Sequence, residues 1–229
     1  MSNPWFHTLG VFDLETTGID VTTSRIVSAH VGVIGPDGTV LEQTDWLADP
    51  GVEIPEQATA VHGITTERAR AEGRPAAIVV GEIVAALASL FDRGIAVTIY
   101  NAPYDLSLLA SEARRYGLSP LSEPTPVIDP LILDKAVDRF RKGKRTLEAA
   151  ALHYSVDLTD AHTAGADAVA AGRVAQALAQ KFAAELAIDV TELHAKQIAW
   201  GAEQAASFQE YMRRTKDPAF VAEGSWPVR

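Results

Sequence analysis

The chain has 229 residues, of which 47% are hydrophobic and 22% charged, a composition that suits one globular α/β domain with an extension. No apolar stretch is long enough to span a bilayer, and the first residues, MSNPWFHT, lack the basic-then-apolar order of a signal peptide. The sequence contains no cysteine, which excludes disulfides and thiolate metal sites, so a metal ion would need oxygen or histidine ligands. These features predict a cytoplasmic protein that does not bind membranes.

The charge of the chain is unevenly distributed. A net charge of −10 disfavours binding to nucleic acid, because affinity for phosphates normally comes from Lys and Arg. Residues 135–145 (KAVDRFRKGKR), however, hold six of the 20 basic residues and a local net charge of +5, which leaves −15 for the other 218 residues. This basic segment is a candidate for contact with phosphates, and a solvated helix end and loop explains it equally well.

Three strands are predicted in the first part of the chain. Short runs rich in β-branched residues and bounded by turn residues indicate strands at 5–14, 25–34 and 39–47, and the turn GPDG joins the last two as a hairpin. Helices are expected at 65–71 and 75–92, the second with an aliphatic stripe.

Strands and helices alternate in the rest of the chain. Buried-type strands at 95–100 and 125–129 each precede a helix that begins near a proline, and further helices are expected at about 146–153, 163–184 and 190–212. The order predicts an α/β fold with a mixed sheet of about five strands, an antiparallel hairpin joined to parallel βα units, and helices on both faces. We expect a domain over 1–187 and a C-terminal helical extension over 188–229, whose tail packs on the domain or on a second copy of it.

Two carboxylates stand at the end of the first strand, in GVFDLETTG. Residues two apart in a strand point to the same face, so Asp13 and Glu15 share a face with Cα atoms roughly 6–7 Å apart. That spacing suits two oxygen ligands for divalent cations. Taken alone, the pair is explained equally well by a strand end that meets water.

A second acid follows the strand at 95–100. Asn101 ends that strand and Asp105 lies in the first turn of the next helix, within YNAPYD. The helix dipole favours a carboxylate there, and the position also faces the mouth of the sheet. An ordinary acid that stabilises the helix start is the favoured explanation when Asp105 is considered alone.

The third stretch is DAHTAGADAVAAG (160–172). Thr163 is a plausible N-cap, which leaves His162 just outside the helix and Asp167 within its first turns. The small residues 164–166 would let this helix approach other backbone closely. A loop histidine beside a metal-bound water is suited to act as a general base, whereas a surface histidine and a capping-region acid is the simpler explanation for each residue alone.

Together, these stretches resemble the DEDDh family of 3′–5′ exonucleases, the DnaQ-like group with a ribonuclease H-like fold. The first family motif, Asp-x-Glu at the end of the first strand, is matched by Asp13 and Glu15. The second, hNAxFD, is matched by YNAPYD with Asp105. The third, His followed by four residues and Asp, is matched by His162 and Asp167.

The resemblance covers roughly residues 6–185. VHGIT (61–65) is also a run common in this family between the first two motifs. Two positions depart from the pattern: Tyr100 replaces the usual His and Tyr104 the usual Phe. Neither position supplies a metal ligand in the family, so these departures bear on substrate fit rather than on catalysis.

The resemblance implies two Mg²⁺ or Mn²⁺ ions held by carboxylates. Asp13 would bridge both ions, while Glu15 and Asp167 complete one site. Asp105 would support the other, and His162 would take the proton from the attacking water. The expected product is a nucleoside 5′-monophosphate released from the 3′ end of a single strand, with DNA favoured over RNA.

Substrate contacts are expected around this site. The candidates are Thr16, Thr17, His62, Asn101, Arg141 and Lys144. The alternatives are an exoribonuclease that trims RNA, a non-catalytic nucleic-acid binding module and a structural acidic domain. The sequence leaves open proofreading, repair or RNA processing as the pathway, and a homodimer or association with a polymerase as the assembly.

Overall fold

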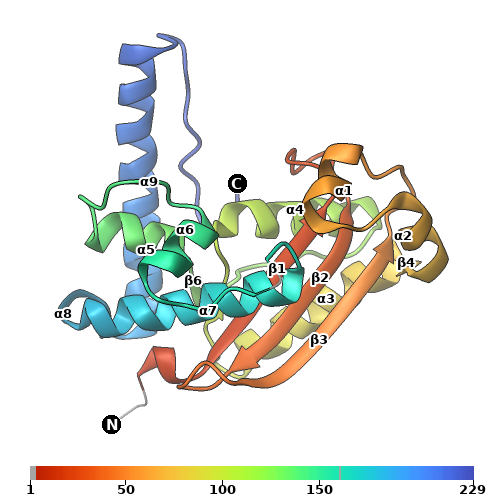
Figure 1. The fold of residues 1–229 in the computed structure, drawn as a ribbon, viewed down its shortest axis with the longest axis horizontal. Helices are drawn as coiled ribbons and strands as arrows, with labels where there is room; N and C mark the ends of the chain where they lie inside the picture. Colours follow the sequence, from red (N-terminus) through yellow and green to blue (C-terminus); the bar gives the residue numbers. More distant parts are fainter. Residues whose placement is uncertain (1–3, 160) are drawn as a thin grey trace.

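A mixed sheet of six strands forms the centre of the molecule (Figure 1). The computed structural model describes residues 4–159 and 161–229. The strands lie in the order β4-β3-β2-β1-β5-β6. Their bounds are β1 (Leu9–Thr16), β2 (Ile26–Ile34), β3 (Val40–Asp49), β4 (Arg74–Pro75), β5 (Val97–Thr98) and β6 (Val127–Ile128).

The pairing of the strands confirms the expected join of an antiparallel hairpin to parallel units. β2 runs antiparallel to both β1 and β3, whereas β5 pairs parallel with β1 and with β6. The expected number of five strands is wrong by one, because the two-residue β4 pairs with the end of β3 and is too short to leave a sequence pattern. Residues 5–8 are not strand: Trp5–His7 form a 3-10 helix, η1, and the indole N–H of Trp5 donates to the carbonyl of Leu186 at 2.8 Å.

Helices cover both faces of the sheet, as predicted. They are α1 (Glu56–His62), α2 (Thr66–Glu72), α3 (Ala76–Asp92), α4 (Ala102–Arg115), α5 (Pro130–Val137), α6 (Leu147–His153), α7 (Ala164–Lys181), α8 (Ala183–Leu186) and α9 (Val190–Thr215). Successive residues of β1 point to opposite faces. Phe12 joins the core formed with α3 and α4, and Val11 joins the core formed with α5, α6 and α7.

One close approach decides where α7 lies. A Cβ atom on Gly172 would come within 2.6 Å of both Val11 on β1 and Ile34 on β2. Real Cβ contacts are not that short, so only glycine lets the helix axis come this near to the sheet. The first turn of α7 is thereby held over β1.

The C-terminal segment packs on the domain, which was one of the two arrangements that the sequence left open. The amide of Gln197 on α9 donates to the carbonyl of Val127 at 3.0 Å and accepts from the N–H of Asp129 at 2.7 Å. Trp226 in the following tail is buried and donates to the carboxylate of Asp129. Figure 1 shows the outer half of α9 standing away from the body with the tail running back beside it. The boundary at residue 187 stays a prediction.

In the part of the chain that the structure describes, no helix combines the length and the apolar character needed to cross a membrane.

Candidate active site

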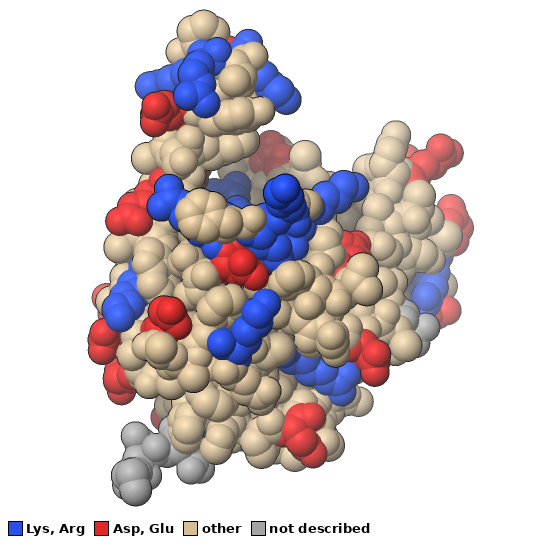
Figure 2. All heavy atoms as spheres, turned by 60° about the vertical axis from the view of Figure 1, so that its left-hand side comes forward, with Lys and Arg blue, Asp and Glu red and all other residues tan. Residues whose placement is uncertain are grey.

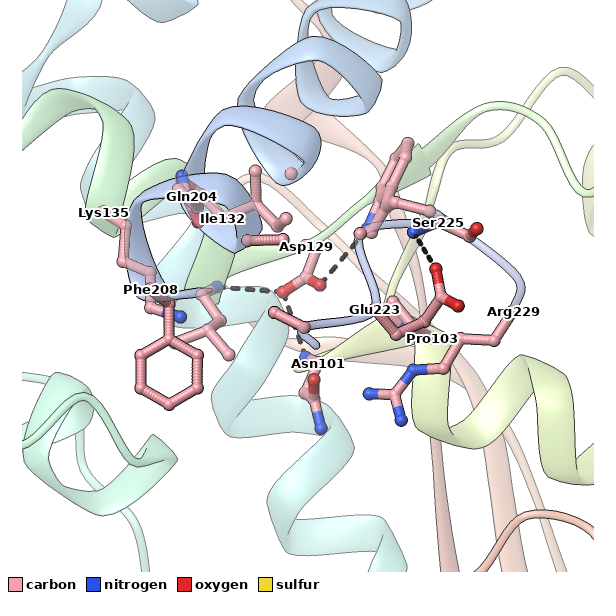
Figure 3. Close-up of a pocket in the computed structure, with 16 residues that line it drawn as sticks. Asn101, Pro103, Asp129, Ile132, Lys135, Gln204, Phe208, Glu223, Ser225 and Arg229 are labelled. Atoms are coloured by element: carbon pink, nitrogen blue, oxygen red, sulfur yellow. Dashed lines mark hydrogen bonds between the residues drawn. The ribbon is translucent and has the colours of Figure 1, made fainter. Parts of the chain in front are cut away.

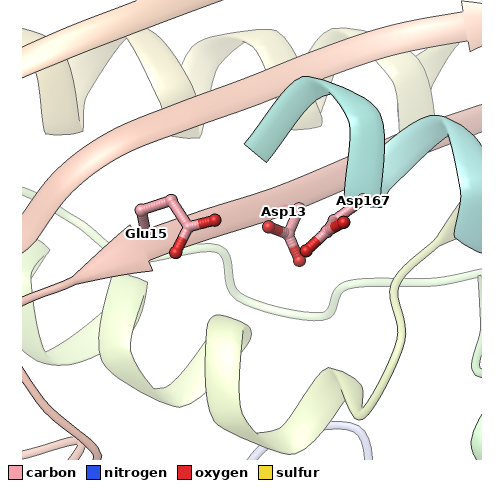
Figure 4. Close-up of side chains that lie close together, drawn as sticks. All are labelled: Asp13, Glu15 and Asp167. Atoms are coloured by element: carbon pink, nitrogen blue, oxygen red, sulfur yellow. The ribbon is translucent and has the colours of Figure 1, made fainter. Parts of the chain in front are cut away.

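Three carboxylates converge at the end of β1. Asp13, Glu15 and Asp167 each place an oxygen within 4.8 Å of the others (Figure 4). The two residues of β1 share a face of the strand, and the pairing with β2 shifts register directly after Glu15, where β2 carries one extra residue. The hydroxyl of Thr163 accepts the N–H of Ala166 and starts α7, so Asp167 lies in its first turn above β1.

The electrostatics of the cluster favour a bound cation. Burial, and then repulsion from Asp105, Glu15 and Asp167, raise the pKa of Asp13 well above its usual value. Burial and the charge of Asp167 raise the pKa of Glu15 to about 7. Burial also raises the pKa of Asp167, against a lowering by the backbone N–H of His162. Carboxylate oxygens, in a chain without cysteine, fit a hard divalent cation such as Mg²⁺ or Mn²⁺, which would neutralise this repulsion.

Asp105 lies beside this group rather than inside it. Its side chain, in the first turn of α4, is 3% exposed. Burial raises its pKa most, with smaller contributions from Asp129 and Glu15, while backbone N–H groups of Asp105 and Leu14 lower it. The structure therefore couples Asp105 to the acids of β1, and its support of a second ion stays a prediction.

His162 lies at the opening of the cluster. Its φ of 69° places it in the left-handed region just before α7, and its N–H lies 3.3 Å from the carboxylate of Asp167. The ring is 47% exposed and has Nε2 3.7 Å from the carboxylate of Glu148. His162, Glu15 and His62 all line one cavity of about 430 Å³. An exposed imidazole on the same cavity as Glu15 has access to a water molecule there.

The structure gives Thr16 and Thr17 a role in the loop after β1. The hydroxyl of Thr16 bonds to the carbonyl of Gly18 at 2.8 Å and to the hydroxyl of Tyr104 at 2.5 Å. The hydroxyl of Thr17 accepts the N–H of Arg25 at 2.9 Å. These bonds close the loop from residue 17 to 25, and direct contact of the two threonines with substrate stays a prediction.

His62 lines the same cavity as His162 and Glu15. Its Nδ1 accepts the N–H of Ile64 at 3.1 Å, and burial lowers its pKa, with a smaller opposite effect from the backbone of Thr16. Contact of His62 with the terminal nucleotide or its phosphate stays a prediction.

The basic segment is divided into two kinds of side chain. Arg141 is only 6% exposed and donates to both oxygens of the buried Asp134, at 3.1 and 2.7 Å. Its guanidinium is engaged by Asp134 in the structure, and contact of Arg141 with phosphate stays a prediction. Arg145 donates to the same carboxylate at 2.7 Å. Lys144 is exposed, and its contact with phosphate stays a prediction.

Asp129 is a positioning residue that the sequence reasoning missed. It is 1% exposed and accepts the N–H groups of Asn101 and Ala102, each at 3.0 Å, which fixes the start of the helix that carries Asp105. Asn101 itself has a φ of 65° and is exposed at the N-terminus of α4. An aspartate directly before Pro130 is a recognisable N-cap, and this pattern in the sequence could have pointed to Asp129.

The fold and the carboxylate cluster together define a nuclease of the ribonuclease H-like fold. The sheet order, the acid pair at the end of β1 and the two acids on α4 and α7 carry that assignment.

Comparison with known proteins gives the family. The exonuclease model RNase_T matches residues 11–175. The chain is 34% identical over 167 residues to a DNA polymerase III subunit epsilon-like protein of Rhodobacter capsulatus. The alignment covers 71% of the chain and 22% of that protein. It is 30% identical over 173 residues to DNA polymerase III PolC-type of Lacticaseibacillus paracasei. That alignment covers 76% of the chain and 11% of that protein. The chain thus belongs to the RNase_T exonuclease family, and the DnaQ-like resemblance is confirmed.

Solved structures agree on the fold. E. coli exonuclease I in complex with a dT13 oligonucleotide matches with a TM-score of 0.67 at 21% identity, over 78% of this chain and 42% of that one. A further exonuclease I structure matches with a TM-score of 0.66 over 76% of the chain. The chain spans only 11% and 22% of the lengths of the two curated relatives above.

Proposed function

We propose that the protein is a metal-dependent 3′–5′ exonuclease that removes nucleoside 5′-monophosphates from single-stranded DNA. The observation that carries the proposal is the convergence of Asp13, Glu15 and Asp167 within 4.8 Å. The charge of Asp105 raises the pKa of Asp13, and His162 lines a cavity together with Glu15. This arrangement supplies oxygen ligands for cations and a base for water, the two requirements of phosphodiester hydrolysis at neutral pH.

Each side chain has a defined part in the proposed reaction. Two Mg²⁺ or Mn²⁺ ions, when bound, would supply positive charge at the scissile phosphate and lower the pKa of water. Asp13, Glu15 and Asp167 would hold one ion, and Asp105 with Asp13 the other. His162 would accept the proton of the attacking water at its imidazole nitrogen.

DNA is favoured over RNA as the substrate because of the relatives. The two curated relatives are named as DNA polymerase III proteins, and one matched structure holds a dT13 oligonucleotide. The same names support association with a polymerase as a further proposal. A homodimer and a cytoplasmic location stay predictions.

The test uses matched DNA and RNA oligonucleotides labelled at the 5′ end, with Mg²⁺, with Mn²⁺ or with EDTA. We expect a ladder that shortens from the 3′ end, release of 5′-monophosphates, and no reaction in EDTA. Asp13→Asn should be inactive, while Asp92→Asn, at the exposed end of α3, should retain activity. Cleavage that starts at the 5′ end or proceeds in EDTA would overturn the proposal, and faster shortening of RNA would reassign the substrate.

A further inference from the structure

A groove runs along the outer half of α9, outside the part of the chain that the family model matches. Two cavities, of about 620 and 190 Å³, lie between this helix and neighbouring segments, and both are lined by Lys135, Gln204 and Phe208. The larger is bounded by the segment 135–145, and the smaller by the start of α4 and the tail at 222–229. Because they share these residues, we treat them as one α9 groove.

The α9 wall of the groove is aromatic. Residues at helical spacing bring Trp200, Phe208 and Tyr211 to the face that lines the larger cavity. The side chains of Phe208 and Tyr211 are 51% and 49% exposed. The ring of Phe208 packs edge-on against Phe220 of the tail, with centroids 5.5 Å apart, so it is held in place although half of it meets solvent.

The opposite wall is basic. Lys135 and Arg139 line the larger cavity, and within residues 4–159 and 161–229 neither side chain has a hydrogen bond or an ion pair. The salt bridges of Arg141 and Arg145 to Asp134 anchor the segment that carries them. Figure 2 shows Lys and Arg side chains gathered beside α9 and at its far end.

Among the residues that the structure describes, three acidic side chains also line the groove. Glu203 lines the α9 wall of the larger cavity, and Glu223 lines the smaller one, where it accepts the N–H of Ser225 at 2.8 Å. Asp129 is buried and its oxygens are already bonded to backbone and to Trp226. The unpaired cations therefore dominate the wall formed by residues 135–145.

The inner end of the groove reaches the catalytic region. Asn101 and Pro103 line the smaller cavity and begin α4, the helix whose first turn holds Asp105 (Figure 3). A polymer that lay in the groove would thus arrive at the N-terminus of α4, the helix that carries Asp105 beside the acid cluster.

We propose that the α9 groove binds the single strand upstream of its 3′ end, with bases stacked on Phe208 and Tyr211 and phosphates beside Lys135 and Arg139. The proposal deepens the proposed function and rests on it. Aromatic rings next to unpaired cations are the combination that holds single-stranded nucleic acid without sequence preference, because every base has a face that stacks and every nucleotide carries a phosphate. The net charge of −10 over the chain then does not prevent binding to nucleic acid, since basic residues are placed where the nucleic-acid strand lies.

The binding test uses 5′-fluorescein-labelled dT20 and rU20 without divalent metal, followed by fluorescence anisotropy. Each stacked base contributes about 1–3 kcal/mol, so Phe208→Ala with Tyr211→Ala should raise the Kd at least about tenfold. Phe208→Tyr with Tyr211→Phe should restore binding. Lys135→Ala with Arg139→Ala should also reduce the slope of log Kd against log salt by about 1.4. The control is Arg93→Ala with Lys196→Ala, which removes the same amount of charge outside the groove. These two residues pair with Glu42 and Glu192.

The activity test compares a 20-nucleotide strand with a dinucleotide that is too short to reach the groove. We expect the groove variants to lower kcat/KM for the long strand about tenfold more than for the dinucleotide. Equal losses on both substrates, or unchanged affinity for dT20, would overturn the proposal. Conversion of a dimer to a monomer by these variants, with oligonucleotide binding intact, would assign the face to a second copy instead. If the wild-type protein binds dT20 through the groove but hydrolyses nothing, the proposed function fails and the groove stands.

Discussion

The hydroxyl of Tyr104 lies 2.5 Å from the hydroxyl of Thr16 and 2.5 Å from the carbonyl of Gly18, so α4 is tied directly to the end of β1. Tyr104 stands one residue before Asp105, and Thr16 stands one residue after Glu15. The position at which the family usually has phenylalanine therefore carries a polar link between two of the three segments that bear the acids.

Removal of that link should loosen the site more than the fold. Tyr104→Phe keeps the ring and deletes the hydroxyl, and one such hydrogen bond contributes about 1 kcal/mol, or roughly 2–4 °C in Tm for a chain of this size. We expect that loss in differential scanning fluorimetry together with a fall in kcat of a few-fold. Tyr116→Phe is the control, since no hydrogen bond of its hydroxyl is found in the described chain. An unchanged kcat in Tyr104→Phe would show that the loop is positioned by other contacts.

The acid cluster should make the metal-free protein less stable than a neutralised variant. The carboxylate of Asp13 is repelled by three neighbouring acids, and Asp13→Asn removes its charge. The Tm in EDTA should therefore rise by a few degrees. The same change should reduce exonuclease activity on the order of 1,000-fold and abolish the rise in Tm that Mg²⁺ gives the wild type. A lower Tm for Asp13→Asn in EDTA would mean that the acid stabilises the fold in another way.

Stability without metal should fall as the pH rises from about 4.5 to 7. Glu15 has a folded-state pKa of about 7 against 4.5 in the unfolded chain, so over this interval the folded protein holds a proton that the unfolded chain releases. Above pH 7 the carboxyl is ionised in both states and the loss is complete. Chemical denaturation in EDTA across this range measures the effect, and Glu15→Gln should flatten it. Because cations need the ionised form, stabilisation by Mg²⁺ should increase over the same interval.

Gly172 should not tolerate a methyl group. Gly172→Ala places a Cβ 2.6 Å from Val11 and Ile34, and overpacking of this kind typically destabilises by about 1–3 kcal/mol. Movement of α7 away from the sheet should also shift Asp167 and lower activity. Gly81→Ala in α3 is the matched control, because its nearest neighbour would be 3.6 Å away and alanine favours helix by up to about 1 kcal/mol. Equal effects of the two changes would argue against a special approach at Gly172.

The sequence predicted the parts of the site that depend on local periodicity. The two acids of β1 follow from strand alternation, and those of α4 and α7 follow from helix starts that proline and threonine mark. The sequence could not show that Arg141 turns inward to Asp134, because that pairing depends on how the segment after α5 folds back. The sequence did not predict β4 for a related reason. Its two residues form a strand only because β3 lies beside them.

Asp129 connects the catalytic region with the end of the chain. Its carboxylate is shared by the backbone at the start of α4 and by the indole of Trp226, while its own N–H bonds to Gln197. Trp226 and Gln197 both lie beyond residue 175, where the family model stops. We therefore expect the smallest unit that keeps Asp105 in position to be larger than the family-matched region. A chain cut at that boundary would remove the indole partner of a buried carboxylate and the acceptor of its backbone N–H, about one helix turn from Asp105.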